Sequence, residues 1–268
     1  MWHQMQEGDF VQTYTEKGFR GSDKEWESMC IPFDEDAKIC LNGVIDRVDL
    51  CSLPGEELIK IIDYKSSDSQ DLSLAKVYYG LQMQLLTYLE AAKEMVEKEH
   101  KGKEAVPAAM LYYAIKEKNL DWKPESEEEY EKRVLDSMKC KGYVNEEPEI
   151  IGHLDKSIVN GGELIPGQKS VVVPVAVDKK GLLKKNSETL STKDFETLIA
   201  HTKEKMKECG KAILDGKIEA IPYVYEDNDG CTYCPYGSVC GHESKKDGVR
   251  EMKKMSDDEV WEALYGDD

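Results

Sequence analysis

The strongest constraint on the fold is a predicted β-hairpin in the first quarter of the chain. Residues 38–50, KICLNGVIDRVDL, and 58–65, LIKIIDYK, are rich in β-branched and apolar side chains, as is typical of strands. The Pro-Gly pair at 54–55 indicates a turn between them. If this pair forms the centre of the turn, paired residue numbers add up to 109, and Asp46 falls opposite Asp63. Opposed residues of antiparallel strands lie about 4.5–5.5 Å apart at Cα, so two carboxylates would share one face of the sheet.

The side chains around these aspartates are suited to phosphodiester hydrolysis. Mg²⁺ and Mn²⁺ prefer oxygen ligands, which Asp46, Asp63 and the backbone carbonyl of Tyr64 could supply. Lys65 shares the face of Asp63, because alternate residues of a strand point the same way. Its ammonium group could orient a water molecule or stabilise charge on a phosphate.

A predicted helix at 72–99 adds two polar side chains to this group. Gln84 and Tyr88 are four residues apart and therefore lie on one helix face. An amide and a phenol at these positions could contact a DNA phosphate or a metal-bound water. The sequence thus places a helix with Gln-x-x-x-Tyr directly after a strand that ends in Asp-x-Lys.

Each of these features also has an ordinary structural explanation. Asp-x-Lys is common at strand ends, Gln84 and Tyr88 could be helix surface, and Asp46 could join Arg47 and Asp49 in a surface ion-pair group. The ordered combination of both strands, the turn and the helix favours a catalytic site.

The rest of the chain predicts an α/β core with an elaboration. We expect strands at 108–117 and 170–177, the second of them an edge or bulged strand because of Pro174. We expect helices at 125–141, 192–215 and 257–264, and a loop at 142–170. A single domain over 1–268 would then have its core at about 35–117 and 170–215, an elaboration at about 118–169 and a Cys-rich tail at 220–245.

The composition excludes several classes of protein. The 268 residues are 40% hydrophobic and 34% charged, as in globular chains and unlike disordered ones. No apolar run of about 18 residues predicts a membrane span, and the N-terminal residues lack the pattern of a signal peptide, so a cytoplasmic location is expected. The net charge of −18 argues against a broad basic surface for nucleic acid, but it allows a local cationic path or a DNA track shared with a basic partner. No Gly-x-x-x-x-Gly-Lys-Ser/Thr loop occurs, so this chain is not expected to be an ATPase motor.

Three of the eight cysteines form a compact motif near the C-terminus. Cys231, Cys234 and Cys240 have the spacing C-x2-C-x5-C, which supplies three soft ligands for Zn²⁺ or an iron–sulfur cluster. The alternative is three free thiols in a turn-rich tail. A disulfide framework is a poor first explanation for the eight cysteines, because no export signal accompanies them.

Several segments together resemble a known nuclease family. GVIDRVD, IIDYKSS and GLQMQLLTYLEAA resemble the PD-(D/E)xK core of the RecB-type exonucleases. AMLYYAIKE, SVVVPVAVDKKGLLKK and CTYCPYGSVC extend the likeness to the C-terminal nuclease domains of the AddB (RexB) family, from about residue 16 onwards. These domains belong to subunits of bacterial ATP-dependent helicase–nucleases that resect double-strand breaks.

The resemblance implies a fold, a reaction and site residues. The fold is a restriction-endonuclease-like mixed sheet flanked by helices, and the activity is a Mg²⁺- or Mn²⁺-dependent DNA exonuclease in repair and recombination. Its partners are single-stranded DNA and an AddA-type helicase–nuclease subunit. By this likeness Asp46 and Asp63 are metal ligands, Lys65 is the catalytic lysine, Gln84 and Tyr88 form an accessory motif, and Cys231, Cys234 and Cys240 bind [4Fe–4S] with a fourth cysteine far upstream.

The chain departs from the family pattern before Asp46. The family has its fourth cysteine and a histidine ligand in that region, whereas Cys30, Cys40 and His3 lack the expected sequence context. We therefore expect the chain to be a fragment of a longer subunit. Two hypotheses follow: the fragment lacks an intact cluster, and its nuclease activity is weak.

Two other functions remain open on the residues alone. One is a non-catalytic docking module with a structural metal site at the C-terminal cysteines, although a scaffold has no need of the Asp-x-Lys pair. The other is a stand-alone nuclease of the kind associated with CRISPR adaptation, which the long elaboration between 101 and 200 disfavours.

Overall fold

The computed structural model describes residues 7–21, 26–66, 71–115, 126–243 and 248–266. The chain divides into two compact units. The first comprises Met1–Cys30, Cys40–Leu72 and Met83–Ala200, and the second comprises Ile31–Ile39, Ser73–Gln82 and His201–Asp268. Assignment of all 268 residues to a single domain stays a prediction.

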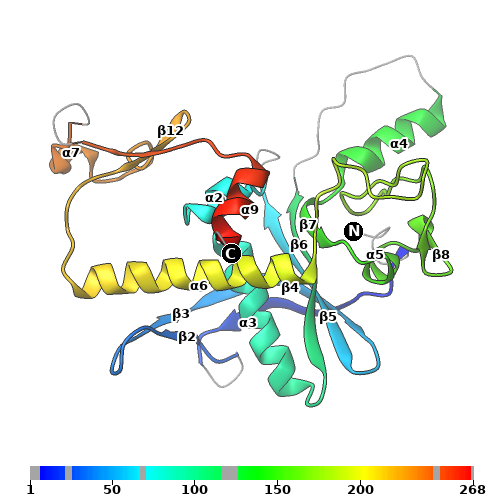
Figure 1. The fold of residues 1–268 in the computed structure, drawn as a ribbon, viewed down its shortest axis with the longest axis horizontal. Helices are drawn as coiled ribbons and strands as arrows, with labels where there is room; N and C mark the ends of the chain where they lie inside the picture. The colour runs from blue at the N-terminus through cyan, green and yellow to red at the C-terminus, as the bar shows by residue number, and fades with distance from the viewer. Residues whose placement is uncertain (1–6, 22–25, 67–70, 116–125, 244–247, 267–268) are drawn as a thin grey trace. The chain divides into compact units, whose positions relative to one another are not determined.

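The first unit is built on a six-stranded mixed sheet with the strand order β1-β4-β5-β6-β7-β10 (Figure 1). Neighbouring strands are antiparallel except for the parallel pairs β5–β6 and β7–β10. The strands are β1 Val11–Phe19, β4 Gly43–Ser52, β5 Glu56–Lys65, β6 Glu104–Ala114, β7 Lys141–Asn145 and β10 Thr189–Leu190. The predicted mixed α/β sheet flanked by helices is confirmed.

The hairpin of β4 and β5 has the predicted register. Its ladder runs from the Arg47–Ile62 pair to the Ser52–Glu57 pair, and every pair of residue numbers adds up to 109. The turn closes with hydrogen bonds in both directions between the backbones of Leu53 and Glu56, at 3.0 and 3.4 Å. Gly55 has φ +88°, which with a preceding proline is the combination that a type II turn requires. The Pro-Gly turn therefore fixes which residues of the two strands face each other.

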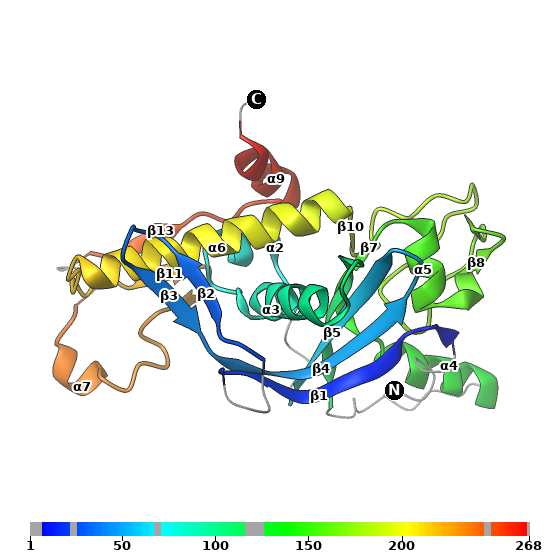
Figure 2. The same ribbon diagram turned by 90° about the horizontal axis from the view of Figure 1, so that it is seen from below.

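Helices cover both faces of the sheet. Helix α3, Gln84–Glu99, contacts β5 and β6 and lies along one face (Figure 2). The opposite side chains of β5, Leu58 and Ile62, belong to a buried cluster that includes Ile151 of helix α5, Pro148–Leu154. Because strand side chains alternate, both faces of β5 are buried, and they are apolar apart from Glu57, Lys60 and Asp63.

The Arg47–Asp49 group is buried, so its interpretation as a surface ion-pair group is wrong. Arg47 Nε and Asp49 Oδ1 are 2.6 Å apart, and Lys60 Nζ lies 2.9 Å from Asp49 Oδ2. The side chains of Arg47, Asp49 and Lys60 are 1%, 0% and 5% exposed, respectively. Alternation places this group on the face of the hairpin opposite Asp46, which separates it from the candidate site.

The predicted helix at 72–99 is two helices, and the predicted loop at 142–170 is mostly ordered secondary structure. Helix α2, Leu74–Tyr78, ends before α3 begins at Gln84, with positive φ at Gly80 between them. Within 142–170, β7 joins the sheet and α5 starts with a proline in its first turn, a favourable start signal that had not been predicted. The segment also contains η1 Lys156–Ile158, β8 Val159–Asn160 and β9 Glu163–Leu164.

The predicted strand at 170–177 is wrong. The buried Ser170 hydroxyl accepts hydrogen bonds from the backbone N–H groups of Val172 and Val173, both at 3.0 Å, and donates to Asp155 Oδ2 at 2.5 Å. Val175 N–H then bonds to the Val173 carbonyl at 2.7 Å. These local bonds replace a ladder and leave only the isolated bridges Lys169–Ala176 and Val177–Leu183 in the described part of this segment.

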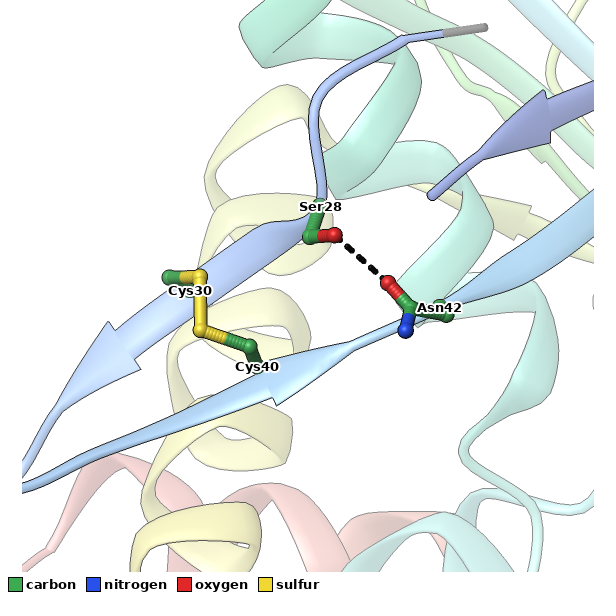
Figure 3. The surroundings of a disulfide bond; sticks show 4 residues. All are labelled: Ser28, Cys30, Cys40 and Asn42. Atoms are coloured by element: carbon green, nitrogen blue, oxygen red, sulfur yellow. Dashed lines mark hydrogen bonds between the residues drawn. A yellow bond between two sulfur atoms is a disulfide. The ribbon is translucent and has the colours of Figure 1, made fainter. Parts of the chain in front are cut away.

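Two strands near the N-terminus carry a disulfide that was not predicted. Strands β2, Met29–Pro32, and β3, Lys38–Leu41, pair with each other, and Cys30 is bonded to Cys40 (Figure 3). The Ser28 hydroxyl donates to Asn42 Oδ1 at 2.6 Å beside it. Neither cysteine therefore offers a free thiolate.

The remaining helices confirm most of the other predictions. Helix α4, Glu127–Ser137, has a capping box formed by Ser126 and Glu129. Helix α6, Thr192–Leu214, begins where Ser191 and Asp194 exchange hydrogen bonds, as expected. Among the described residues, no helix is both long enough and apolar enough to cross a membrane.

The second unit holds the C-terminal elements. Helix α9, Asp257–Tyr265, contacts α2, and a small sheet has the order β12-β11-β13. The short helix α7, Gly237–Cys240, ends at the last cysteine of the motif. The strands are β11 Tyr223–Tyr225, β12 Asn228–Asp229 and β13 Arg250–Met252.

A buried carboxylate ties the hairpin to the segment before β6. The Glu57 side chain is 1% exposed and accepts hydrogen bonds from Ser52 Oγ at 2.6 Å and from Lys103 Nζ at 3.0 Å; His100 Nδ1 lies 3.0 Å from it. Burial raises the pKa of Glu57, but the bonds from Ser52, Lys103 and His100 outweigh it and hold the pKa below its ordinary value. Ionised Glu57 therefore stabilises the folded state above the pKa of an unfolded carboxyl group, and this contribution is lost as the pH falls through the lowered pKa.

We predict that Glu57→Gln lowers the free energy of unfolding by about 1–3 kcal/mol at pH 7, because charged hydrogen-bond partners lose their carboxylate. The loss should shrink in acid, where wild-type Glu57 is also protonated. Urea unfolding of both proteins at pH 7 and in acid measures this loss of stability. Glu56→Gln, at an exposed neighbouring residue, is the matched control. An equal loss at both pH values would contradict the role assigned to ionised Glu57.

Candidate active site

Asp46 and Asp63 meet at one end of the hairpin. Asp46 Oδ2 accepts a hydrogen bond from the backbone N–H of Tyr64 at 2.8 Å, just beyond the last pair of the ladder. This bond holds the Asp46 carboxylate against the residue that follows Asp63 in β5. The negative charge of Asp46 is close enough to affect the pKa of Asp63.

Asp63 is buried beside a lysine. Its side chain is 4% exposed, and Lys65 Nζ lies 2.6 Å from its Oδ2. Burial raises the pKa of Asp63 above its ordinary value, Lys65 opposes this rise, and Asp46 adds to it. Among the described residues, the ion pair with Lys65 is the polar contact of this buried Asp63 Oδ2 atom.

The predicted residues of α3 join this group through hydrogen bonds. Lys65 Nζ donates to Gln84 Oε1 at 3.0 Å, and Gln84 Nε2 donates to the Tyr88 hydroxyl at 3.0 Å. The Tyr88 ring meets Phe19 edge to face, with ring centroids 6.0 Å apart. A Cβ at Gly43 would lie 2.7 Å from the Phe19 ring and 3.4 Å from Tyr88, so a larger residue there would displace the ring that packs on Tyr88. The first turns of α3 thus deliver both side chains to the end of β5.

Tyr112 also belongs to the site and had not been predicted. It lies directly opposite Asp63 in the parallel pairing of β5 and β6, and Lys65 Nζ sits over its ring, 5.2 Å from the centroid. Burial raises the pKa of Tyr112 to about 12, with further rises from Asp63 and Tyr88. The strand itself was predicted, but its register against β5 depends on an irregularity where Ile59 is opposite Pro107 and Lys60 is opposite Ala109, which was not predicted.

The donor groups of the site fit a hard divalent cation. Two carboxylates share the end of the hairpin, and Asp63 is buried with a single ammonium group against its Oδ2 atom among the described residues. Oxygen ligands of this kind suit Mg²⁺ or Mn²⁺. No group of three or more His, Cys, Asp or Glu side chains placed to hold a metal occurs in the described part of the chain, so a backbone oxygen or water would have to complete the set.

The C-terminal cysteines are exposed thiols on one turn-rich segment. Cys234 N–H bonds to the Cys231 carbonyl at 3.1 Å, and Asp229 Oδ1 accepts from Cys231 N–H at 2.9 Å. Loss of hydration, Asp229 and the two other cysteines of the motif raise the pKa of the Cys231 thiol. Thiolates suit a soft metal, but among the described residues these three are not placed as a group that holds one.

The upstream residues that lack the family's sequence context, Cys30, Cys40 and His3, supply no ligand in the part of the chain that the structure describes. Cys30 and Cys40 are joined to each other, so neither can serve as a thiolate ligand in this structure. His3 lies outside the described residues.

Comparison with known proteins identifies the family. The model of the PD-(D/E)XK nuclease superfamily matches residues 2–241. An ATP-dependent helicase/deoxyribonuclease subunit of Lachnoclostridium phytofermentans is 34% identical over 269 residues, which are 99% of this chain and 22% of that protein. The corresponding subunit is 34% identical over 247 residues in a Thermoanaerobacter species, covering 91% of this chain and 20% of that protein. In Clostridioides difficile the corresponding subunit is 30% identical over 267 residues, which are 98% of this chain and 22% of that protein.

The chain spans about a fifth of the length of these relatives, and the likeness covers nearly all of it. The family match includes the hairpin, helix α3 and the three C-terminal cysteines. The fold agrees with the match, because a mixed sheet flanked by helices carries an Asp-x-Lys pair at the end of a central strand. This chain belongs to the PD-(D/E)XK nuclease superfamily.

Proposed function

We propose that the chain is the nuclease domain of an ATP-dependent helicase–deoxyribonuclease subunit and hydrolyses DNA phosphodiester bonds with Mg²⁺ or Mn²⁺. The observation that carries this proposal is the cluster of Asp46, Asp63 and Lys65, in which the Asp46 carboxylate is fixed by Tyr64 N–H and Lys65 lies 2.6 Å from Asp63. A scaffold has no need of a buried Asp–Lys pair beside a second carboxylate.

Asp46 and Asp63 would hold the cation, with the carbonyl of Tyr64 as a third oxygen. A divalent cation bound there supplies a water of lowered pKa and neutralises charge on the phosphate. Lys65 directs its ammonium group at the same place, where it orients water and stabilises negative charge that develops on the phosphate. Gln84 keeps Lys65 in position through its amide oxygen, and Tyr88 fixes the Gln84 amide.

The substrate and partners follow from the relatives' names and from the charge of the chain. Those relatives are subunits of ATP-dependent helicase/deoxyribonucleases, so we propose that DNA reaches this site as a single strand supplied by a helicase activity, in an assembly with an AddA-type subunit. We propose that the protein is cytoplasmic and acts as an exonuclease in double-strand break repair and recombination. The net charge of −18 supports delivery through a path lined partly by a partner, because a chain of this charge repels DNA at long range.

We further propose that Cys231, Cys234 and Cys240 ligate a [4Fe–4S] cluster in the intact protein. Their spacing and shared segment support this proposal, and a fourth ligand must come from another residue. The cluster would stabilise the irregular tail, whose two aromatic residues within the motif, Tyr233 and Tyr236, are 92% and 67% exposed.

We predict that Asp63→Ala and Lys65→Ala each lower the rate of single-stranded DNA cleavage by about a hundredfold or more in the intact protein, because each removes a charge from the reacting centre. Cleavage of end-labelled DNA with Mg²⁺ or Mn²⁺ measures the loss. Lys98→Ala, which removes an exposed lysine of α3, should cleave like the wild type. Equal rates in all four proteins would refute the catalytic assignment.

A second prediction concerns the cysteines. Cys234→Ser should remove iron and visible charge-transfer absorbance from protein purified without oxygen, whereas Cys209→Ser, at an exposed cysteine of α6, should retain both. Iron content per protein chain gives the comparison. Iron at the same level in both variants, or absent from the wild type, rules out the cluster proposal.

A further inference from the structure

The ring of Tyr112 is a fixed surface under the Lys65 ammonium group. Tyr112 is 5% exposed and lies in β6, one of the central strands of the sheet. Its backbone is directly opposite Asp63, and the neighbouring pairs on the same ladder are Tyr64–Tyr113 and Lys65–Ala114. The register of β5 against β6 therefore fixes the position of the Tyr112 ring along the sheet, beside the end of β5.

Lys65 has three polar or electrostatic contacts among the described residues. Its Nζ lies 2.6 Å from Asp63 Oδ2, 3.0 Å from Gln84 Oε1 and 5.2 Å from the centre of the Tyr112 ring. A lysine side chain has a flexible four-carbon stem and is costly to hold in one geometry. The Asp63 carboxylate is also the group to which a cation would bind, and the Gln84 side chain is exposed. Of the three groups that contact the Lys65 ammonium group, the Tyr112 ring is the one that is both buried and uncharged.

A cation above an aromatic face is attracted by the negative face of the ring, and this attraction grows when water is partly excluded. The Lys65 side chain is 23% exposed, so its ammonium group is partly desolvated at the ring. The attraction needs only the aromatic face and not the hydroxyl group. Phenylalanine would preserve it, and leucine would remove it.

We propose that Tyr112 is a positioning residue that holds the Lys65 ammonium group at the reacting centre through the face of its ring. This inference rests on the proposed nuclease function for its effect on rate, but the contact itself exists without substrate or cation. Tyr112 acts on Lys65 and not on the DNA, so its loss should lower the turnover number and leave substrate binding unchanged.

The kinetic test compares Tyr112→Phe with Tyr112→Leu in the intact protein, on single-stranded DNA with Mg²⁺. Tyr112→Phe should keep kcat within about twofold, and Tyr112→Leu should lower kcat roughly tenfold with little change in KM. Tyr143→Leu is the matched control, because Tyr143 is 6% exposed on the adjacent strand β7 and pairs with Met110. Tyr143→Leu should lose as much folding stability as Tyr112→Leu, but it should keep the kcat of the wild type.

A spectroscopic test needs neither cation nor DNA. The δ and ε methylene protons of Lys65, assigned by their absence in Lys65→Met, should resonate upfield in the wild type and in Tyr112→Phe because of the ring current. The upfield shift should disappear in Tyr112→Leu, or in Tyr112→Met if the leucine variant does not fold.

Two results would overturn the proposal: an upfield shift that persists without the aromatic ring, or a Tyr112→Leu variant with the kcat of the wild type. Failure of the proposed function looks different. In that case Asp63→Ala would cleave DNA like the wild type, while the ring-current shift of Lys65 would still report whether Tyr112 holds the lysine.

Discussion

The site depends on one hydrogen bond, from the backbone N–H of Tyr64 to Asp46 Oδ2 at 2.8 Å. That bond exists only because the hairpin has the register set by the Pro-Gly turn, in which Arg47 is opposite Ile62. A slip by one residue would turn every side chain of β5 to the other face, and the carboxylate of Asp63 would leave the side of α3. The Pro-Gly turn at the far end of the hairpin therefore determines whether the carboxylates of Asp46 and Asp63 lie close together.

The same hairpin uses buried charge in two ways. On one face, Arg47 and Lys60 flank Asp49 at 2.6 and 2.9 Å, and all three are nearly fully buried and mutually compensated. On the other face, Asp63 has a lysine at 2.6 Å, but burial and the nearby Asp46 carboxylate still raise the pKa of Asp63 above its ordinary value. A structural ion pair satisfies its charges. A group left partly uncompensated in a buried position is typical of a functional site.

The sequence predicted local features well and remote ones poorly. The turn, the register of β4 and β5 and the start of α6 follow from residues close together in the chain, and all three are confirmed. The strand predicted at 170–177 failed because the Ser170 hydroxyl binds backbone groups that a ladder would have used. Tyr112 was missed because its place beside Asp63 depends on parallel pairing of strands separated by the whole of α3. Neither the partner of Cys30 nor the membership of β7 in the sheet has a local signal.

The end of the hairpin is thus a proposed cation site in a member of the PD-(D/E)XK nuclease superfamily, next to a lysine that contacts Gln84 and Tyr112. Anomalous X-ray diffraction from crystals grown with Mn²⁺ tests this most directly. We predict a manganese peak in contact with carboxylate oxygens of both Asp46 and Asp63. A protein saturated with Mn²⁺ that shows no peak there, with Asp46 still bonded only to Tyr64 N–H, would contradict the central claim.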